Sequence, residues 1–298
     1  MSITILDGGM GRELQRMGAP FRQPEWSAEA LIKAPDAVKK AHQHFLEAGS
    51  SVITVNSYAC VPFHLGEERF RDWGDSLIHL AAEIARQSAD EYGPASVAGC
   101  IPPPLGSYKP ELFNRETALP ILSKLVKNQA QFVDLWLAET ISSIAEMRAI
   151  AEVLETSTLP RWFAFSLSDQ IEEGKEVPTL RSGEPVEQAV NAALEAGADA
   201  VLFNCSVPEV MLPALESTAK TLSAQNINGI QLGAYANAFL PINPGHSANL
   251  ALQETREITT GEYLHFARQW CTAGATIVGG CCGITPAHIT ALDALNNS

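Results

Sequence analysis

The sequence predicts a (β/α)8 TIM barrel that forms a single domain over residues 1–298. The first observation behind this prediction is a pattern shared by residues 47–54, 195–202 and 272–278, in which Ala-Gly precedes an apolar run. Glycine just past a helix adopts the left-handed conformation without steric cost, and the apolar run fits a strand buried on both faces. The repeating unit is therefore a helix, a short turn and a parallel strand.

The second observation is the number of candidate strands. Eight runs of suitable length lie near residues 3–9, 51–57, 96–102, 135–140, 161–168, 200–206, 230–236 and 276–282. Helical patterns separate them; one begins at Pro35 and another covers 187–194, with apolar residues three and four apart. Third, the chain has 298 residues and no linker, charge run or low-complexity tract divides it, which suits one barrel.

Composition and charge exclude several classes of function. The chain has 34 acidic and 20 basic residues, and its formal net charge of −14 repels phosphate backbones, so no nucleic-acid partner is expected. The N-terminus has neither a basic flank nor a long apolar stretch, so we expect no signal peptide, no membrane anchor and a cytoplasmic protein. Six cysteines are too few for a disulfide scaffold, and we expect free thiols or metal ligands.

Loop lengths place the functional site. The segments that follow strands are long at 57–70, 101–114 and 237–259, and unstructured loops of this length are usually functional. The site is therefore expected at the carboxyl ends of the strands, where barrel enzymes carry their active sites. The 237–259 loop is either a lid over that face or a surface excursion.

Three cysteines follow even-numbered strands. Cys205 ends the sixth predicted strand, and Cys281 and Cys282 end the eighth. Inward side chains of alternate strands share one layer, so these sulfurs can meet across the barrel mouth. Thiolates are preferred zinc ligands, and three protein ligands with one open position are typical of a catalytic site. The alternatives are small buried side chains or a redox-active pair.

A regular strand cannot direct both Cys281 and Cys282 to one metal, because neighbouring side chains point to opposite faces. Both can bind only if the backbone leaves strand geometry there. The glycines at 279, 280 and 283 permit that departure. The remaining cysteines, Cys60, Cys100 and Cys271, are interpreted as inert small side chains.

Polar residues also follow strands one, two and four. Glu139 comes after an apolar strand, and a carboxylate there is costly to bury without a cationic partner. It is a candidate to bind a substrate ammonium group, or else it pairs with a barrel arginine. Asn56 occupies the corresponding end of strand two. In Asp7-Gly8-Gly9 the glycines let the backbone approach a ligand, and free amides can hold a carboxylate.

These elements together resemble the zinc-dependent homocysteine S-methyltransferase family over nearly the whole chain. The residues that carry the resemblance are Asp7-Gly8-Gly9, Asn56-Ser57-Tyr58, Glu139-Thr140, Asn204-Cys205 and the Gly-Gly-Cys-Cys-Gly run at 279–283. The resemblance implies Zn²⁺ as cofactor, with Cys205, Cys281 and Cys282 as its ligands. It also implies that Asp7, Gly8, Gly9 and Glu139 bind the amino-acid end of L-homocysteine and that Asn56 lines the pocket. Tyr235-Ala236-Asn237 departs from the Tyr-Pro-Asn of many relatives.

The implied reaction is methyl transfer from an onium donor to the thiol of homocysteine, giving methionine. S-Methylmethionine or S-adenosylmethionine is the expected donor. A betaine-type donor is less favoured, because relatives that use it tend to carry a C-terminal extension. Aromatic residues in or beside the long loops attract cations but receive no individual role. These residues are Tyr58, Phe63, Tyr108, Phe113 and Tyr235.

Two other functions remain open on the sequence alone. One is a barrel aldolase or isomerase in which Gly279-Gly280 binds phosphate. The other is a non-catalytic zinc or thiol redox sensor that uses the same cysteines.

Overall fold

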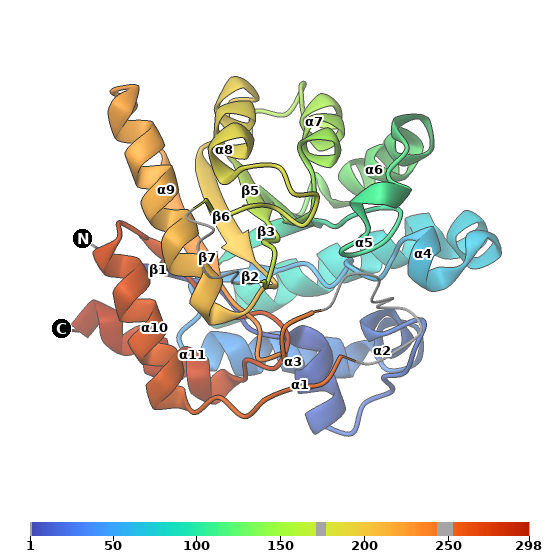
Figure 1. Ribbon diagram of the computed structural model, residues 1–298. Helices are drawn as coiled ribbons and strands as arrows, with labels where there is room; N and C mark the ends of the chain where they lie inside the picture. Colours follow the sequence, from blue (N-terminus) through green and yellow to red (C-terminus); the bar gives the residue numbers. More distant parts are fainter. Residues whose placement is uncertain (1, 171–176, 243–252, 298) are drawn as a thin grey trace.

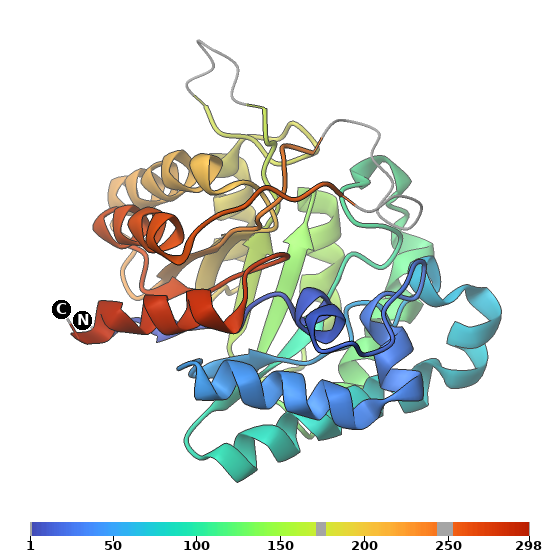
Figure 2. The same cartoon turned by 90° about the horizontal axis from the view of Figure 1, so that it is seen from below.

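Eight parallel strands form a nearly closed barrel surrounded by helices (Figures 1 and 2). The computed structural model describes residues 2–170, 177–242 and 253–297. The strands are β1 (Thr4–Ile5), β2 (Val52–Thr54), β3 (Ser96–Ile101), β4 (Leu135–Ile141), β5 (Arg161–Phe165), β6 (Ala200–Asn204), β7 (Gln231–Tyr235) and β8 (Ile277–Val278). Each coincides with a predicted run, and the predicted (β/α)8 fold is confirmed.

Helices fill the connections between successive strands. The α-helices are α1 (Met10–Arg16), α2 (Ser27–Lys33), α3 (Pro35–Glu47), α4 (Pro62–Leu65), α5 (Glu67–Tyr92), α6 (Arg115–Gln129), α7 (Ile144–Val153), α8 (Val186–Glu195), α9 (Met211–Ala224), α10 (Thr260–Thr272) and α11 (Pro286–Asp293). The described residues also include the short 3₁₀ helices η1 (Pro110–Leu112), η2 (Pro208–Val210) and η3 (Ala294–Asn297). The N- and C-terminal segments lie side by side, and Ile3 N donates a hydrogen bond to Asn296 Oδ1 at 2.7 Å.

The three predicted helix-ending glycines have the backbone conformation that the pattern requires. Gly49, Gly197 and Gly274 have φ angles of 107°, 73° and 106°. Each lies two residues after the last helical residue of α3, α8 or α10. An L side chain at these angles would be strained. These turns bring each helix back into the following strand of the barrel.

Two apolar clusters stabilise the fold. The larger lies between the helices and the sheet and contains residues from nearly every element. The smaller contains residues in or next to all eight strands and none from the helices, so it fills the barrel interior. This smaller cluster includes Tyr235, the last residue of β7, and Cys281 packs against the cluster. The apolar interior therefore forms the floor beneath the carboxyl ends of the strands.

The sheet is least continuous between β1 and β2, a boundary that we call the β1–β2 seam (residues 5–7 against 50–54). One isolated parallel bridge, between Leu6 and Val52, replaces a full ladder in these residues. Side chains supply further hydrogen bonds: Ser50 Oγ donates to the Leu6 carbonyl at 3.2 Å and Ile5 N donates to Ser51 Oγ at 3.1 Å. A backbone hydrogen bond from Ser51 N to the Ile5 carbonyl at 2.8 Å also crosses the seam, so backbone and side chains close the barrel here together.

The predicted lid segment is described only at its two ends. Residues 243–252 of the 237–259 loop lie outside the described residues. On either side of them the chain pairs antiparallel, with a bridge between Phe239 and Thr255 and a 2.9 Å hydrogen bond from Arg256 N to the Ala238 carbonyl.

Within the described ranges, no helix has the length and apolar character needed to cross a membrane.

Candidate zinc and substrate site

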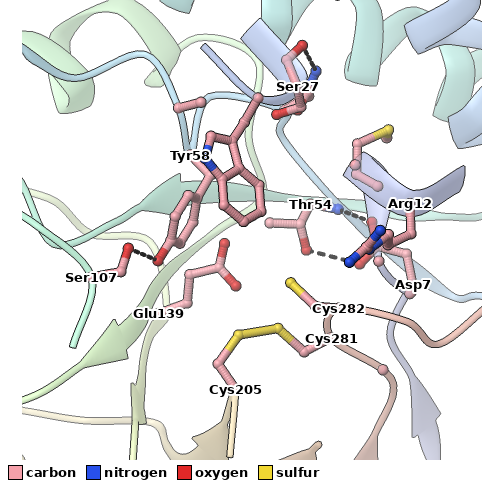
Figure 3. A pocket seen from close by; sticks show the side chains of 18 of the residues that line it. Asp7, Arg12, Ser27, Thr54, Tyr58, Ser107, Glu139, Cys205, Cys281 and Cys282 are labelled. Atoms are coloured by element: carbon pink, nitrogen blue, oxygen red, sulfur yellow. Dashed lines mark hydrogen bonds between the residues drawn. A yellow bond between two sulfur atoms is a disulfide. The ribbon is translucent and has the colours of Figure 1, made fainter. Parts of the chain in front are cut away.

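One pocket at the carboxyl ends of the strands contains all the predicted site residues. Its walls come from the segments that follow β1, β2, β3, β6, β7 and β8, and from Glu139 within β4. The eight predicted residues that line it are Asp7, Gly8, Gly9, Asn56, Glu139, Cys205, Cys281 and Cys282. Figure 3 labels five of them, namely Asp7, Glu139 and the three cysteines. Residues as far apart in the sequence as Asp7 and Cys282 thus share one cavity.

The three cysteines converge on one side of this pocket. Their Sγ atoms all lie within 4.8 Å of one another. Cys205 and Cys281 are joined by a disulfide, with their Cα atoms 5.7 Å apart, whereas Cys282 is free. Cys205 and Cys281 are therefore oxidised in this structure rather than free thiols, and the expectation that they are metal ligands applies to the reduced protein.

The backbone leaves strand geometry before the cysteine pair, as predicted. Strand β8 ends at Val278, and Ile284 N donates to the Cys281 carbonyl at 3.1 Å, which closes a turn over Cys282. Gly283 has a φ of 86°, and a Cβ there would lie 2.8 Å from Ala238 Cβ. The turn therefore needs glycine, and it lets Cys281 and Cys282 approach the same point.

A zinc ion fits this set of donors. Tetrahedral Zn–S bonds of about 2.3 Å place ligand sulfurs about 3.8 Å apart. The sulfurs of the cluster, all within 4.8 Å of one another, lie near this spacing, and reduction of the disulfide would free Cys205 and Cys281 to bind. Three thiolates would leave one position of a tetrahedral zinc ion for a further ligand.

Glu139, near the end of β4, faces the pocket, and its carboxylate accepts hydrogen bonds from uncharged side chains. Its Oε1 accepts a hydrogen bond from Cys100 Sγ at 3.1 Å and its Oε2 accepts one from Tyr235 OH at 3.3 Å. No arginine or lysine of the described residues pairs with it, so the alternative of a barrel salt bridge is not observed. Burial raises the pKa of its carboxyl, although the two hydrogen bonds lower it.

Cys100 and Tyr235 were not predicted to support Glu139. Cys100 was interpreted as inert, yet its thiol is buried and donates to the carboxylate. The only signal in the sequence was its position near the end of a predicted strand. Since the contact joins β3 to β4, it depends on the register between two strands, which the sequence does not display.

The Asp7 carboxylate accepts hydrogen bonds from the neighbouring strand β2. Thr54 N donates to its Oδ2 at 2.8 Å and Thr54 Oγ1 donates to its Oδ1 at 3.1 Å (Figure 3). Burial raises the pKa of Asp7 to about 7, against the lowering effect of these hydrogen bonds. Asp7 therefore connects β1 to β2 across the seam while it also lines the pocket, and its predicted role in binding homocysteine stays a prediction.

An aromatic wall faces the cysteines. It consists of Phe21, Trp26, Tyr58, His64 and Tyr108, all of which line the pocket. Edge-to-face contacts connect Phe21 to Trp26 and Trp26 to His64, with centroids 5.8 Å and 6.1 Å apart. Burial lowers the pKa of His64 to about 4, so its ring is neutral near pH 7. Phe63 and Phe113, by contrast, do not line the pocket.

A buried ion pair lies behind Cys205. Arg181 Nη2 and Asp169 Oδ2 are 2.8 Å apart, and their side chains are 8% and 0% exposed. Arg181 also donates to the Cys205 carbonyl at 3.4 Å and lies over the Tyr108 ring at 4.5 Å from its centroid. The pair thus connects the residue after β6 to the pocket wall after β3.

The glycines at 279 and 280 are used for packing. A Cβ at Gly279 would lie 2.5 Å from Leu6 Cβ, and one at Gly280 would lie 2.2 Å from Ile284 Cγ2. They therefore allow β8 to pass close to β1 and to the turn after it. Because Leu6 and Ile284 occupy the space beside these glycines, the packing gives no support to the alternative in which Gly279-Gly280 binds phosphate.

Known proteins with similar sequences match nearly the whole chain. It is 26% identical to homocysteine S-methyltransferase 1 of Brassica oleracea var. italica, over 97% of this chain and 92% of that protein. It is 27% identical to selenocysteine methyltransferase of Astragalus bisulcatus, over 95% of this chain and 89% of that protein.

The same fold occurs in crystal structures of the homocysteine methyltransferase MmuM from Escherichia coli. Its metallated form aligns with a TM-score of 0.78 at 24% identity, over 99% of this chain and 96% of that chain. Its oxidized form aligns with a TM-score of 0.77 at 25% identity, with the same coverage.

The family comparison is decisive for the class of protein. The family model described as homocysteine S-methyltransferase matches residues 4–295. The prediction that the protein is a methyltransferase enzyme is confirmed, and the chain belongs to the homocysteine S-methyltransferase family.

Proposed function

We propose that this protein transfers a methyl group from an onium donor to the thiol of L-homocysteine and thereby forms methionine. In this proposal Zn²⁺ is held by Cys205, Cys281 and Cys282, and residues 1–298 act as a single domain. S-Methylmethionine or S-adenosylmethionine is the donor. The observation that carries the proposal is the cluster of three sulfurs, within 4.8 Å of one another, in the same pocket as the unpaired carboxylate of Glu139.

Each substrate group has a counterpart in the pocket. The α-ammonium group of homocysteine fits Glu139, whose two oxygens are already oriented by Cys100 and Tyr235. The Gly8-Gly9 backbone lies beside Cys281, since a Cβ at Gly9 would be 2.7 Å from the Cys281 carbonyl oxygen. The amino-acid end of the substrate would thus be held between β1 and β4 while its sulfur reaches the cysteines.

The bound metal would supply one chemical effect, which is to lower the pKa of the homocysteine thiol so that the thiolate predominates near neutral pH. The chain's own residues orient the reactants. A C–S bond forms at the homocysteine sulfur while the donor's bond to the methyl carbon breaks, and the electron pair of that bond stays on the donor atom. The onium donor thereby becomes neutral.

The aromatic wall supports an onium donor. Aromatic faces attract sulfonium and quaternary ammonium groups, and they exclude water from the site. Tyr58 is fixed in this wall, because its OH lies 2.7 Å from Ser107 Oγ. A betaine-type donor carries the same kind of charge and is retained as an alternative donor.

The proposed activity is tested with reduced, zinc-loaded protein. Homocysteine is supplied with S-methylmethionine, S-adenosylmethionine or glycine betaine in parallel reactions, and methionine is quantified. Turnover with a sulfonium donor supports the proposal. Stoichiometric zinc without methionine formation from any donor would contradict it.

A redox sensor is the second candidate, because the Cys205–Cys281 disulfide uses two of the three proposed zinc ligands. The MmuM enzyme has likewise been crystallised in metallated and oxidized forms. A sensor without catalytic activity would bind zinc reversibly as its thiols are reduced and oxidised, but would form no methionine. The turnover assay above therefore separates the two functions.

A further inference from the structure

Arg12 is a charged residue of the pocket that the proposed chemistry does not yet use. It lies in the first turn of α1, directly after the Asp7–Gly11 segment, and its side chain lines the pocket with Asp7 and Cys282 (Figure 3). His64 is neutral near pH 7. Among the described lining residues, Arg12 therefore carries the only permanent positive charge.

The Arg12 guanidinium has no carboxylate partner within the described ranges. Its Nη1 donates to Gln15 Oε1 at 2.9 Å, a contact that orients the group but leaves most of its five N–H donors unused. Asp7 lines the same pocket, but both of its oxygens accept hydrogen bonds from Thr54. The other arginine of this helix, Arg16, is paired with Glu13 at 2.6 Å and lies outside the pocket.

We propose that Arg12 binds the α-carboxylate of an amino-acid substrate, and so makes the pocket selective for substrates that carry this group. The planar guanidinium matches a carboxylate with two parallel hydrogen bonds, a geometry that lysine cannot reproduce. This inference rests on the proposed function, since homocysteine and S-methylmethionine are both α-amino acids. The carboxylate belongs to the acceptor or to the donor, and the two sources are distinguished experimentally.

Charge complementarity favours an amino acid over a phosphate at Arg12. The acidic side chains of Asp7 and Glu139 line the same pocket, and they would repel a doubly charged phosphate. A zwitterion satisfies both signs of charge, with its ammonium group at Glu139 and its carboxylate at Arg12. The pocket thus distinguishes α-amino acids from simple thiols or sulfonium ions.

The test measures binding directly, without turnover. Reduced, zinc-loaded protein is titrated by calorimetry with L-homocysteine and its carboxamide, and separately with S-methylmethionine and its carboxamide. Arg12→Met should weaken binding of one carboxylate ligand on the order of 10- to 100-fold and leave its carboxamide nearly unchanged, as expected for loss of a charge-assisted hydrogen bond. The ligand that responds identifies the source of the carboxylate. Arg12→Lys should recover part of the loss.

Arg16→Met is the matched control, because it removes the same charge from the same helix outside the pocket. It should leave all four affinities unchanged. Equal losses for carboxylate and carboxamide in Arg12→Met, no loss for either pair, or wild-type protein that binds no carboxylate ligand better than its amide would overturn the proposal. Failure of the proposed function is seen separately, as absent methionine formation by the wild-type protein.

Discussion

Cys205 adopts a left-handed backbone conformation, with a φ of 48°, at the point where the chain leaves β6. Such a conformation is unfavourable for a residue with a Cβ and persists only where the surroundings enforce it. Here Arg181 donates to the Cys205 carbonyl, and Cys205 N donates to the Tyr235 carbonyl at 3.4 Å. The strained residue is also one of the three clustered cysteines, so the local strain lies at the proposed metal site.

Substitution of Cys205 is the direct test of the ligand set. Cys205→Ala should lower zinc affinity by more than about 100-fold and abolish methyl transfer, because loss of even an outer-shell partner costs 10- to 100-fold. Competition with a chromogenic chelator measures the affinity. Cys271→Ala is the control, since that thiol is free and lies in α10 away from the pocket. Unchanged tight zinc binding in Cys205→Ala would refute the assignment.

Glu139→Gln tests the proposed ammonium contact. The variant keeps the shape of the side chain but loses its charge, so the KM for homocysteine should rise on the order of 10-fold or more. Zinc content should stay the same, because Glu139 is not among the three clustered sulfur donors. Steady-state kinetics at fixed donor concentration provide the measurement. An unchanged KM would show that the ammonium group binds elsewhere.

At the scale of single elements, α7 begins beside a buried carboxyl group. Glu146 lies in its first turn, is 3% exposed, and accepts a 2.6 Å hydrogen bond from Ser142 N. Burial raises its pKa from 4.5 to about 7, although the hydrogen bonds from Ser142 and Ser143 lower it. The folded state therefore binds this proton more tightly than the unfolded state.

The sign of the pH dependence follows from this raised pKa. The stabilising contribution of protonated Glu146 is complete below pH 4.5 and is lost as the pH rises through about 7. Glu146→Gln removes this titration, so the variant should not lose stability from this group in this pH range. Between pH 4.5 and 8, the free energy of unfolding of the wild type should fall by at most about 3 kcal/mol more than that of the variant. Urea unfolding of both proteins at several pH values measures the difference. Parallel pH profiles would contradict the prediction.

The elements were predictable because their signals are local. Each Ala-Gly turn and each apolar run lies within one short segment, and the three cysteines follow strands whose order the βα repeat already implies. Thr54 and Cys100, by contrast, contact segments that the sequence does not align with them: Thr54 reaches Asp7 across the seam, and Cys100 reaches Glu139 on the next strand. The disulfide was not predictable either, since its formation depends on the oxidation state of the thiols as well as on their position.

At the scale of the whole molecule, the β1–β2 seam is the weakest part of the barrel wall. One backbone bridge and several side-chain hydrogen bonds replace the longer ladders found elsewhere, such as β5 with β6. Openings of a folded protein begin where few interactions must be broken. We therefore expect amides at 4–7 and 50–54 to exchange with deuterium faster than those at 161–165 and 200–204.

Ser50→Ala sharpens this prediction. It removes the bond to the Leu6 carbonyl and should lower the free energy of seam opening by about 1 kcal/mol, seen as selectively faster exchange at 4–7 and 50–54. Ser88→Ala is the control, because that hydroxyl is also buried and donates to a carbonyl, but within α5. Uniformly faster exchange in Ser50→Ala would indicate global destabilisation instead.

The pocket lies directly over this seam, with Gly8, Gly9 and Arg12 on the β1 side and Asn56 and Tyr58 on the β2 side. A substrate that contacts both sides would hold β1 and β2 together across the least connected boundary of the barrel. Its binding free energy then adds to the closure of the barrel, and a ligand at about 100 times its Kd stabilises a folded protein by about 2.7 kcal/mol. In the proposed complex, the bound substrate would therefore strengthen the boundary that the sheet itself leaves least connected.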